Sequence, residues 1–102
     1  MVPVESRLMA KDRYRPFEHR DWRAENGMFE IGDRVVIPKL VWVDFRPWAP
    51  GITGTVVRNS KAYLGIIVRL DSPRKEIDPL SGDAMEITEY NFNGRHLAKL
   101  EA

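Results

Sequence analysis

The chain has 102 residues, of which 43% are hydrophobic and 30% are charged, and its formal net charge is +1. This length and balance indicate one globular domain with a modest core. The absence of cysteine excludes disulfides, thiolate metal sites and cysteine nucleophiles. No apolar run approaches the roughly 18–20 residues of a membrane span, and the N-terminus lacks the apolar stretch of a secretion signal, so we expect a cytoplasmic protein.

Residues 1–28 are rich in charge and read as an N-terminal arm that precedes the main domain. Within them, "PFEHRDWRAENG" begins with Pro16 and ends with Gly27. Proline in the first turn and glycine just past the last turn are typical of a short helix. The pattern predicts a helix over residues 16–26, with an ordered arm that lays one or two aromatic side chains on the main domain as the alternative.

The main domain, residues 29–102, reads as a series of short strands. "LGIIVRLD" alternates between aliphatic side chains on one face and Ile67 and Arg69 on the other, which is typical of a half-buried strand. "AMEITEY" alternates in the same way. Glycine, proline and asparagine separate the β-rich stretches. The strands are expected at residues 29–37, 54–59, 64–71, 84–90 and 97–102.

The connections between these strands carry turn signals. "DSPRKEIDPLSGD" (71–83) contains two prolines and a glycine, and is expected to be a loop in which Asp78 caps backbone groups. "NFNGRHL" (91–97) predicts a tight turn or one 3₁₀ turn. Leu97 and Leu100 are expected to close the core from the C-terminal end.

Five short strands without a long helix define a mainly β chain. They are too few for a two-sheet sandwich of ordinary size. They favour a small, strongly bent, partly open barrel of five strands, because bending the sheet protects its edges.

The order "IGDRVVI", "GITGTVV", "GIIVRLD" resembles small SH3-like barrels, including KOW-type and Tudor-like domains. The opening "FEIGDRVVIP" is similar to the start of the polymerase-binding domain of CarD-type regulators, and "YNFNGRHLAKLE" is similar to the end of the photosystem I subunit IV group. Together these resemblances cover residues 29–101. They imply an SH3-like barrel with a binding role, in which residues 40–50 fall where such folds carry their first long loop, a common binding element.

The first long loop, "VWVDFRPWAP", contains three aromatic side chains. Alternation along an extended segment places Val41, Val43 and Phe45 towards the core. Trp48 is flanked by two prolines, which predicts a stiff loop that exposes its ring. Trp42 is left undecided between core and surface.

The middle of the chain is basic, since residues 34–69 hold six basic residues and one acid (6 − 1 = +5), whereas residues 71–102 hold four basic residues and seven acids (4 − 7 = −3). This asymmetry creates two charged poles unless the two halves interleave in space. Arginine, lysine and aromatic rings together suit either a protein interface or stacking on single-stranded nucleic acid. The candidate partner-binding residues are Trp42, Arg46, Trp48, Arg58, Lys61, Tyr63 and Arg69.

Several other chemistries lack support in the sequence. Gly51 and Gly54 precede a strand rather than a helix with a lysine, so they indicate a sharp turn with positive φ rather than a phosphate loop. The C-terminal acids do not match the spacing of a calcium loop. His19 and His96 belong to no catalytic motif. We therefore expect no enzyme activity, no metal and no cofactor.

Three functions remain open at this point. The first is a non-catalytic module that docks on a protein partner within a larger assembly through the 40–50 loop. The second is a KOW-like barrel that binds nucleic acid through the basic and aromatic surface. The third is a small inhibitory or structural factor of the phage type.

Overall fold

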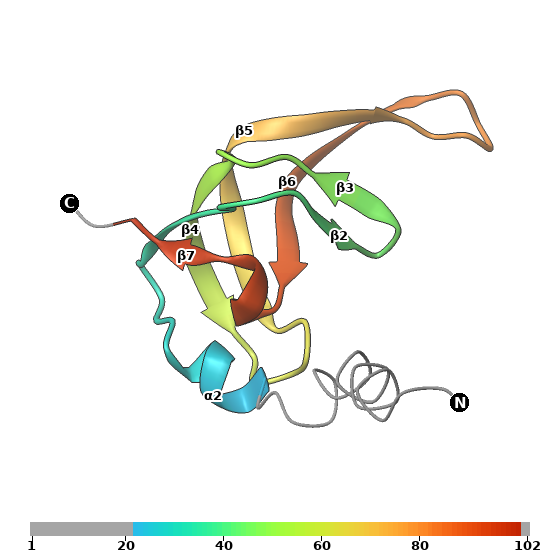
Figure 1. Cartoon of the computed structure of the whole chain (residues 1–102). Helices are drawn as coiled ribbons and strands as arrows, with labels where there is room; N and C mark the ends of the chain where they lie inside the picture. The colour runs from blue at the N-terminus through green and yellow to red at the C-terminus, as the bar shows by residue number, and fades with distance from the viewer. Residues whose placement is uncertain (1–21, 101–102) are drawn as a thin grey trace, which may run out of the picture.

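The computed structural model of the protein describes residues 22–100. Within this range the chain is mainly β, as expected, and Figure 1 shows the strands gathered above one short helix. The elements in chain order are α2 (Trp22–Gly27), β1 (Arg34–Val36), β2 (Val41–Val43), β3 (Arg46–Trp48), β4 (Thr53–Asn59), β5 (Ile66–Ile77), β6 (Ala84–Phe92), the 3₁₀ turn η1 (Gly94–His96) and β7 (Ala98–Lys99).

Five of the strands form one antiparallel sheet in the order β6-β5-β4-β1-β7. Strand β1 is paired on both sides, with Val35 opposite Gly54 of β4 and opposite Lys99 of β7. The first and last strands of the sheet are therefore neighbours, although far apart in sequence. The expected five sheet strands and the 3₁₀ turn before the last strand are confirmed.

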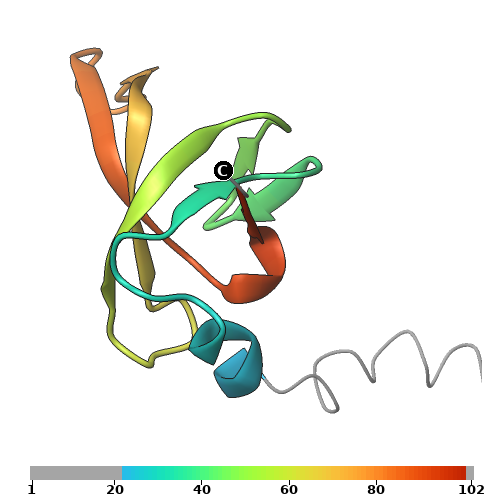
Figure 2. The same ribbon diagram turned by 90° about the vertical axis from the view of Figure 1, so that its left-hand side faces the viewer.

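The remaining two strands, β2 and β3, form a separate hairpin in the connection between β1 and β4, where the sequence predicts only a loop. Val41 lies opposite Trp48 and Val43 lies opposite Arg46, so two residues make the turn. Figure 2 shows this hairpin facing the upper parts of β5 and β6. Side chains of Arg46 and Trp48 reach across to those two strands.

Strand β5 continues well beyond the expected end at residue 71. It runs to Ile77, and its pairing with β6 shifts register between Arg69 and Arg74. Pro73 lies in that irregular stretch, where a missing backbone N–H breaks no regular ladder hydrogen bond. The prediction of a loop over 71–83 is therefore wrong for its first half. Beyond the shift, residues 74–87 form a paired extension that projects from the sheet in Figure 1. From here on we call this extension the arm; it is distinct from the N-terminal segment of residues 1–28.

The core lies between the inner face of the sheet and the β2–β3 hairpin. The predicted alternation in β5 is confirmed, since Arg69 is exposed between buried Val68 and Leu70. Leu97 is buried as expected, whereas Leu100 is exposed. The buried hydrophobic side chains are Phe29, Val35, Ile37, Val43, Trp48, Val56, Ile66, Val68, Leu70, Phe92 and Leu97.

Helix α2 is fixed to one end of the sheet by a buried asparagine. The Asn26 side chain donates a hydrogen bond to the Ala62 carbonyl oxygen (2.9 Å) and accepts one from the Gly94 amide (2.7 Å). A Cβ on Gly94 would lie 2.5 Å from the Glu25 carbonyl oxygen, so glycine permits this close packing. The helix ends at Gly27, one residue beyond the expected end at 26, and residues 16–21 of the predicted helix lie outside the described residues.

The segment predicted as a strand over 29–37 is a strand only from Arg34 to Val36. The preceding residues turn, with Gly32 at φ 96° and the Asp33 carboxylate accepting a hydrogen bond from the Glu30 amide. The expected positive φ is present at Gly51, where it is 90°, but not at Gly54, where glycine instead permits the close approach of β5.

Candidate functional site

The turn between β2 and β3 consists of Asp44 and Phe45, whose φ angles are 52° and 63°. A two-residue hairpin turn with both φ angles positive is the type I′ geometry, which favours asparagine, aspartate and glycine. Aspartate fits this turn, but a bulky aromatic residue does not, and the left-handed conformation costs about 1–2 kcal/mol outside glycine. Phe45 is also 98% exposed. The turn therefore displays a phenylalanine where local energetics favour glycine.

Side chains of the sheet hold this turn in place. The Tyr90 hydroxyl donates to an Asp44 carboxylate oxygen (3.0 Å) and accepts from Arg46 Nη1 (3.2 Å). Arg46 Nε lies 3.0 Å from both carboxylate oxygens of Glu76, and Arg74 Nε lies 2.8 Å from one of them. We call Asp44, Arg46, Arg74, Glu76 and Tyr90 the clamp, because both residues that flank Phe45 are bound to β5 and β6 through it.

The clamp also changes the proton affinities of its members. Hydrogen bonds to Glu76 and Tyr90 raise the pKa of Arg46, which keeps the guanidinium charged. Burial raises the pKa of Tyr90, and the neighbouring Asp44 acts in the same direction. The Tyr90 hydroxyl therefore remains protonated and able to donate to Asp44 at neutral pH.

The outer face of the hairpin carries a second exposed aromatic side chain. Trp42 is 65% exposed and lies opposite Pro47 in the register, so the two side chains share this face. The sequence left Trp42 undecided, and the structure places it at the surface. Leu40, just before β2, is exposed as well. The hairpin thus presents Leu40, Trp42 and Phe45 to solvent.

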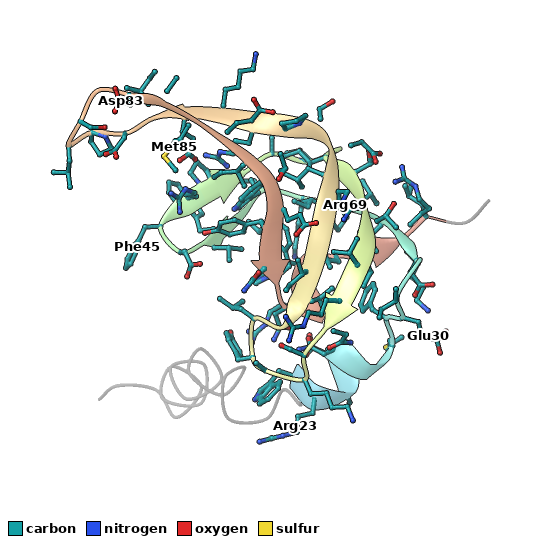
Figure 3. The ribbon with its side chains drawn as sticks, turned by 180° about the vertical axis from the view of Figure 1, so that it is seen from behind. Arg23, Glu30, Phe45, Arg69, Asp83 and Met85 are labelled. Carbon is teal, nitrogen blue, oxygen red and sulfur yellow. The ribbon has the colours of Figure 1, made fainter. Side chains whose placement is uncertain are left out.

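The arm lies beside the hairpin. Arg46 reaches Glu76 across the gap, and the Arg74 guanidinium donates to the Pro47 carbonyl oxygen. Figure 3 shows Phe45 at the tip of the hairpin and Met85 on the neighbouring arm, on the same side of the molecule. Met85 lies opposite Glu76 in the register, which puts it on the arm face that meets the hairpin. The hairpin and arm therefore form one continuous surface.

A groove of about 620 Å³ lies between the end of the hairpin and the irregular part of β5. Its charged groups already have partners. Asp71 accepts hydrogen bonds from Arg34 and Thr53, which lower its pKa to about 2. Arg74 binds Glu76. The groove thus offers a ligand little unpaired charge, and it is lined by residues 47–53 and 70–74.

The structure reverses two assignments made from the sequence for this hairpin. Trp48, expected at the surface, is 0% exposed and packs its ring on Tyr90 and Phe92 with centroid distances of 4.7 and 5.1 Å. Phe45, expected in the core, is the most exposed of the three aromatic residues. The cause is the turn at 44–45, because the alternation of an extended strand stops at Val43 and does not continue to Phe45.

The remaining candidate residues lie in separate places. Arg58 and Arg69 are exposed on the outer face of the sheet, in strands β4 and β5, and Arg69 pairs with Glu89. Lys61 and Tyr63 lie in the β4–β5 connection beside α2, where the Tyr63 ring is 6.0 Å from that of Trp22. The seven candidates therefore do not form one surface.

The two charged halves of the sequence interleave in space. Arg34, Arg46 and Arg69 from the basic half form ion pairs with acids from the C-terminal half, at Asp71, Glu76 and Glu89 respectively. Strand pairing between β4, β5 and β6 brings these charges together. The predicted basic pole is correspondingly weakened over the sheet and the hairpin.

Sequence reasoning missed Phe45, Met85 and the clamp residue Tyr90. The available signal for Phe45 was Asp44, because type I′ turns favour aspartate, whereas phenylalanine at the next position argues against such a turn. The contacts of Tyr90 depend on the packing of the hairpin against β6, so no local pattern predicts them.

Searches for a related protein returned none: no protein-family model, no curated protein and no solved structure matches this chain. In residues 22–100, no group of three or more histidine, aspartate or glutamate side chains is arranged to hold a metal ion. The one α-helix described, α2, is far too short to cross a membrane.

Proposed function

We propose that this chain is a non-catalytic binding module with an SH3-like barrel fold, which docks on a protein partner within a larger assembly through the β2–β3 hairpin. The fold assignment is supported by the chain order. A hairpin occupies the first long connection, three antiparallel strands follow, and a 3₁₀ turn leads into a last strand that pairs with the first. This order agrees with the resemblance of residues 29–101 to SH3-like barrels.

The observation that carries the proposed docking site is the conformation and exposure of Phe45. A bulky aromatic residue in the left-handed region is strained, and such strain persists where surrounding contacts enforce it, often at binding sites. The clamp supplies those contacts on both sides of the turn. Aromatic side chains supply much of the binding free energy at protein interfaces, particularly when they enter a pocket on the partner. Phe45 is therefore the expected anchor, with Trp42 beside it.

A protein is favoured over nucleic acid by the placement of the positive charges. Binding to a phosphate backbone needs several uncompensated lysine or arginine side chains along one path. Two of the arginines in that hypothesis, Arg46 and Arg69, form ion pairs with glutamates, while Arg58 and Lys61 lie away from the hairpin. The exposed side chains of the hairpin are mostly apolar, and the one exposed charged residue between Val41 and Trp48 is the acid Asp44.

The test uses a library of random peptides displayed on phage and selected on the immobilised full chain. Each selected peptide is then measured against Phe45→Ala, which removes the ring at an exposed position. We expect most selected peptides to lose at least about tenfold in affinity, a typical loss for an interface anchor. The matched control is Ile31→Ala, an exposed aliphatic residue between α2 and β1, which should leave binding unchanged.

Two results would overturn this proposal. One is a set of peptides that bind Phe45→Ala as tightly as the unaltered chain. The other is tight, salt-sensitive binding of single-stranded oligonucleotides together with no peptide selection, which would transfer the role to nucleic acid.

A further inference from the structure

We propose that the arm is a second docking element beside the hairpin, and that the partner offers an apolar surface rimmed by lysine and arginine. This inference rests on the proposed function, because it extends the same binding surface. Figures 1 and 3 show the arm and the hairpin extending towards the same side of the molecule.

The tip of the arm displays an exposed leucine on an ordered turn. Leu80 is 97% exposed. The Asp78 carboxylate accepts a hydrogen bond from the Leu80 amide (2.9 Å), and the Asp78 carbonyl oxygen accepts one from the Gly82 amide (2.7 Å). The Asp78 amide donates to the Asp83 carbonyl oxygen (2.8 Å). These bonds confirm the predicted capping role of Asp78, and they fix the position from which Leu80 projects.

Two more apolar side chains of the arm are exposed, one on each of its faces. Met85 lies opposite Glu76, on the face next to the hairpin, whereas Ile77 follows Glu76 in the strand and lies on the other face. Met85 and Leu80 on the arm and the exposed apolar side chains on the hairpin therefore form two neighbouring groups. Contiguous exposed apolar side chains with polar neighbours are typical of protein interaction sites.

The charge around these two groups of apolar side chains indicates which charge the partner should carry. The hairpin (41–48) and the arm (74–87) together contain three basic residues and five acids, which gives 3 − 5 = −2. Partners at an interface carry complementary charge, which speeds encounter and excludes partners of the same sign. A partner with lysine and arginine around an apolar patch therefore fits this surface. The five acids are Asp44, Glu76, Asp78, Asp83 and Glu86.

The same charge argues against the two other occupants. A second copy of this chain docking through the same face would bring two net-negative surfaces together, since a symmetric dimer pairs a patch with itself. A nucleic acid would bring phosphates to a surface of the same sign. Both are outcomes that the experiment below detects.

The experiment takes the peptides selected on the full chain and divides them by their dependence on Phe45. Phe45-dependent peptides are expected to combine apolar residues with lysine or arginine. They should bind Leu80→Ser about tenfold more weakly than the unaltered chain. Asp83→Lys, an exposed position in the same turn as Leu80, should also weaken them, and it should reduce the loss of affinity with added salt. The matched controls in the α2–β1 connection, Ile31→Ser and Glu30→Lys, should change neither quantity.

The outcomes separate this inference from the proposed function. Peptides that need Phe45 but ignore Leu80→Ser and Asp83→Lys, or that carry no basic residues, overturn the role of the arm and leave the hairpin site intact. Peptides that ignore Phe45 overturn both. Sedimentation showing a dimer that Leu80→Ser dissociates would replace the basic partner with a second copy. Oligonucleotide binding lost in Leu80→Ser would replace it with nucleic acid.

Discussion

The hydroxyl of Tyr90 lies 3.0 Å from a carboxylate oxygen of Asp44, and this hydrogen bond joins strand β6 to the turn that displays Phe45. The two residues are distant in sequence, so only the folded chain brings them together. Asp44 occupies the first position of the turn, with a φ of 52°. The bond therefore fixes the residue next to Phe45 and thereby limits how the turn can relax.

Tyr90→Phe tests this role of the hydroxyl. Removing it takes one hydrogen bond from Asp44 and one from Arg46 but leaves the ring that packs on Trp48. We expect a loss of about 1–2 kcal/mol in the free energy of unfolding, because two partly exposed hydrogen bonds are lost and each contributes about 0.5–1 kcal/mol. Backbone ¹⁵N relaxation should show increased motion at residues 44 and 45. Unchanged relaxation at both residues would show that the strands alone hold the turn.

Two substitutions of Trp48 test whether its ring belongs to the core. Its ring is fully buried, so Trp48→Ala should lower the free energy of unfolding by about 3–5 kcal/mol. Among the described residues its Nε1 has no hydrogen-bond acceptor. Trp48→Phe removes that unpaired donor and keeps an aromatic ring, so we expect a cost of about 1 kcal/mol or less. Urea unfolding measures both. Equal, small losses for the two variants would contradict the core assignment.

His96 should make stability depend on pH. Burial, followed by repulsion from Arg95, lowers its pKa from 6.5 to about 4. Below pH 6.5 the unfolded chain therefore binds a proton that the folded chain does not. Stability from this group is complete above pH 6.5 and declines as pH falls towards 4, by up to about 1.4 kcal/mol per pH unit.

The check on His96 combines two measurements. NMR titration of the ring should give a midpoint far below 6.5. His96→Gln stays neutral, so its free energy of unfolding should change less than that of the unaltered chain between pH 6.5 and 5, above the range in which most carboxylates titrate. Parallel curves in that range would contradict the burial effect.

Gly54→Ala tests whether β4 needs a glycine at this position because β5 approaches closely. A Cβ there would collide with the Arg69 carbonyl oxygen and a Val68 methyl group on the neighbouring strand. Gly54→Ala should therefore cost about 1–3 kcal/mol, the usual range for overpacking. Gly27→Ala is the matched control, since a Cβ at Gly27 would meet no atom within 4 Å. An unchanged free energy of unfolding in Gly54→Ala would show that β4 and β5 move apart easily at this position.

Periodicity predicted the sheet well because alternation reports burial directly. The buried residues of β5, the 3₁₀ turn at Gly94–His96 and the closing strand after it all followed from local patterns. The extension of β5 past Pro73 did not. Proline is a strong turn signal, and only the register shift between β5 and β6 accommodates it. That shift depends on pairing with a strand more than ten residues later.

The candidate site was predicted only in outline. Residues 40–50 were correctly singled out as a distinct element in the first connection, but Trp48 and Phe45 were assigned to opposite environments from those observed. Continuing the alternation through Asp44-Phe45 treated a turn as a strand. The ion pairs of Arg46 and Arg69 depend on which acids the sheet topology brings near, so the charge of the middle segment could not be evaluated from the sequence alone.

The most direct test of the central claim, that Phe45 is held in a strained conformation for binding, is the free energy of unfolding of Phe45→Gly measured with its affinity for the selected peptides. Glycine suits this turn and Phe45 buries almost nothing. We predict that Phe45→Gly is more stable by about 1 kcal/mol and binds at least about tenfold more weakly. A variant that is less stable, or that binds the peptides as tightly as the unaltered chain, would contradict the account.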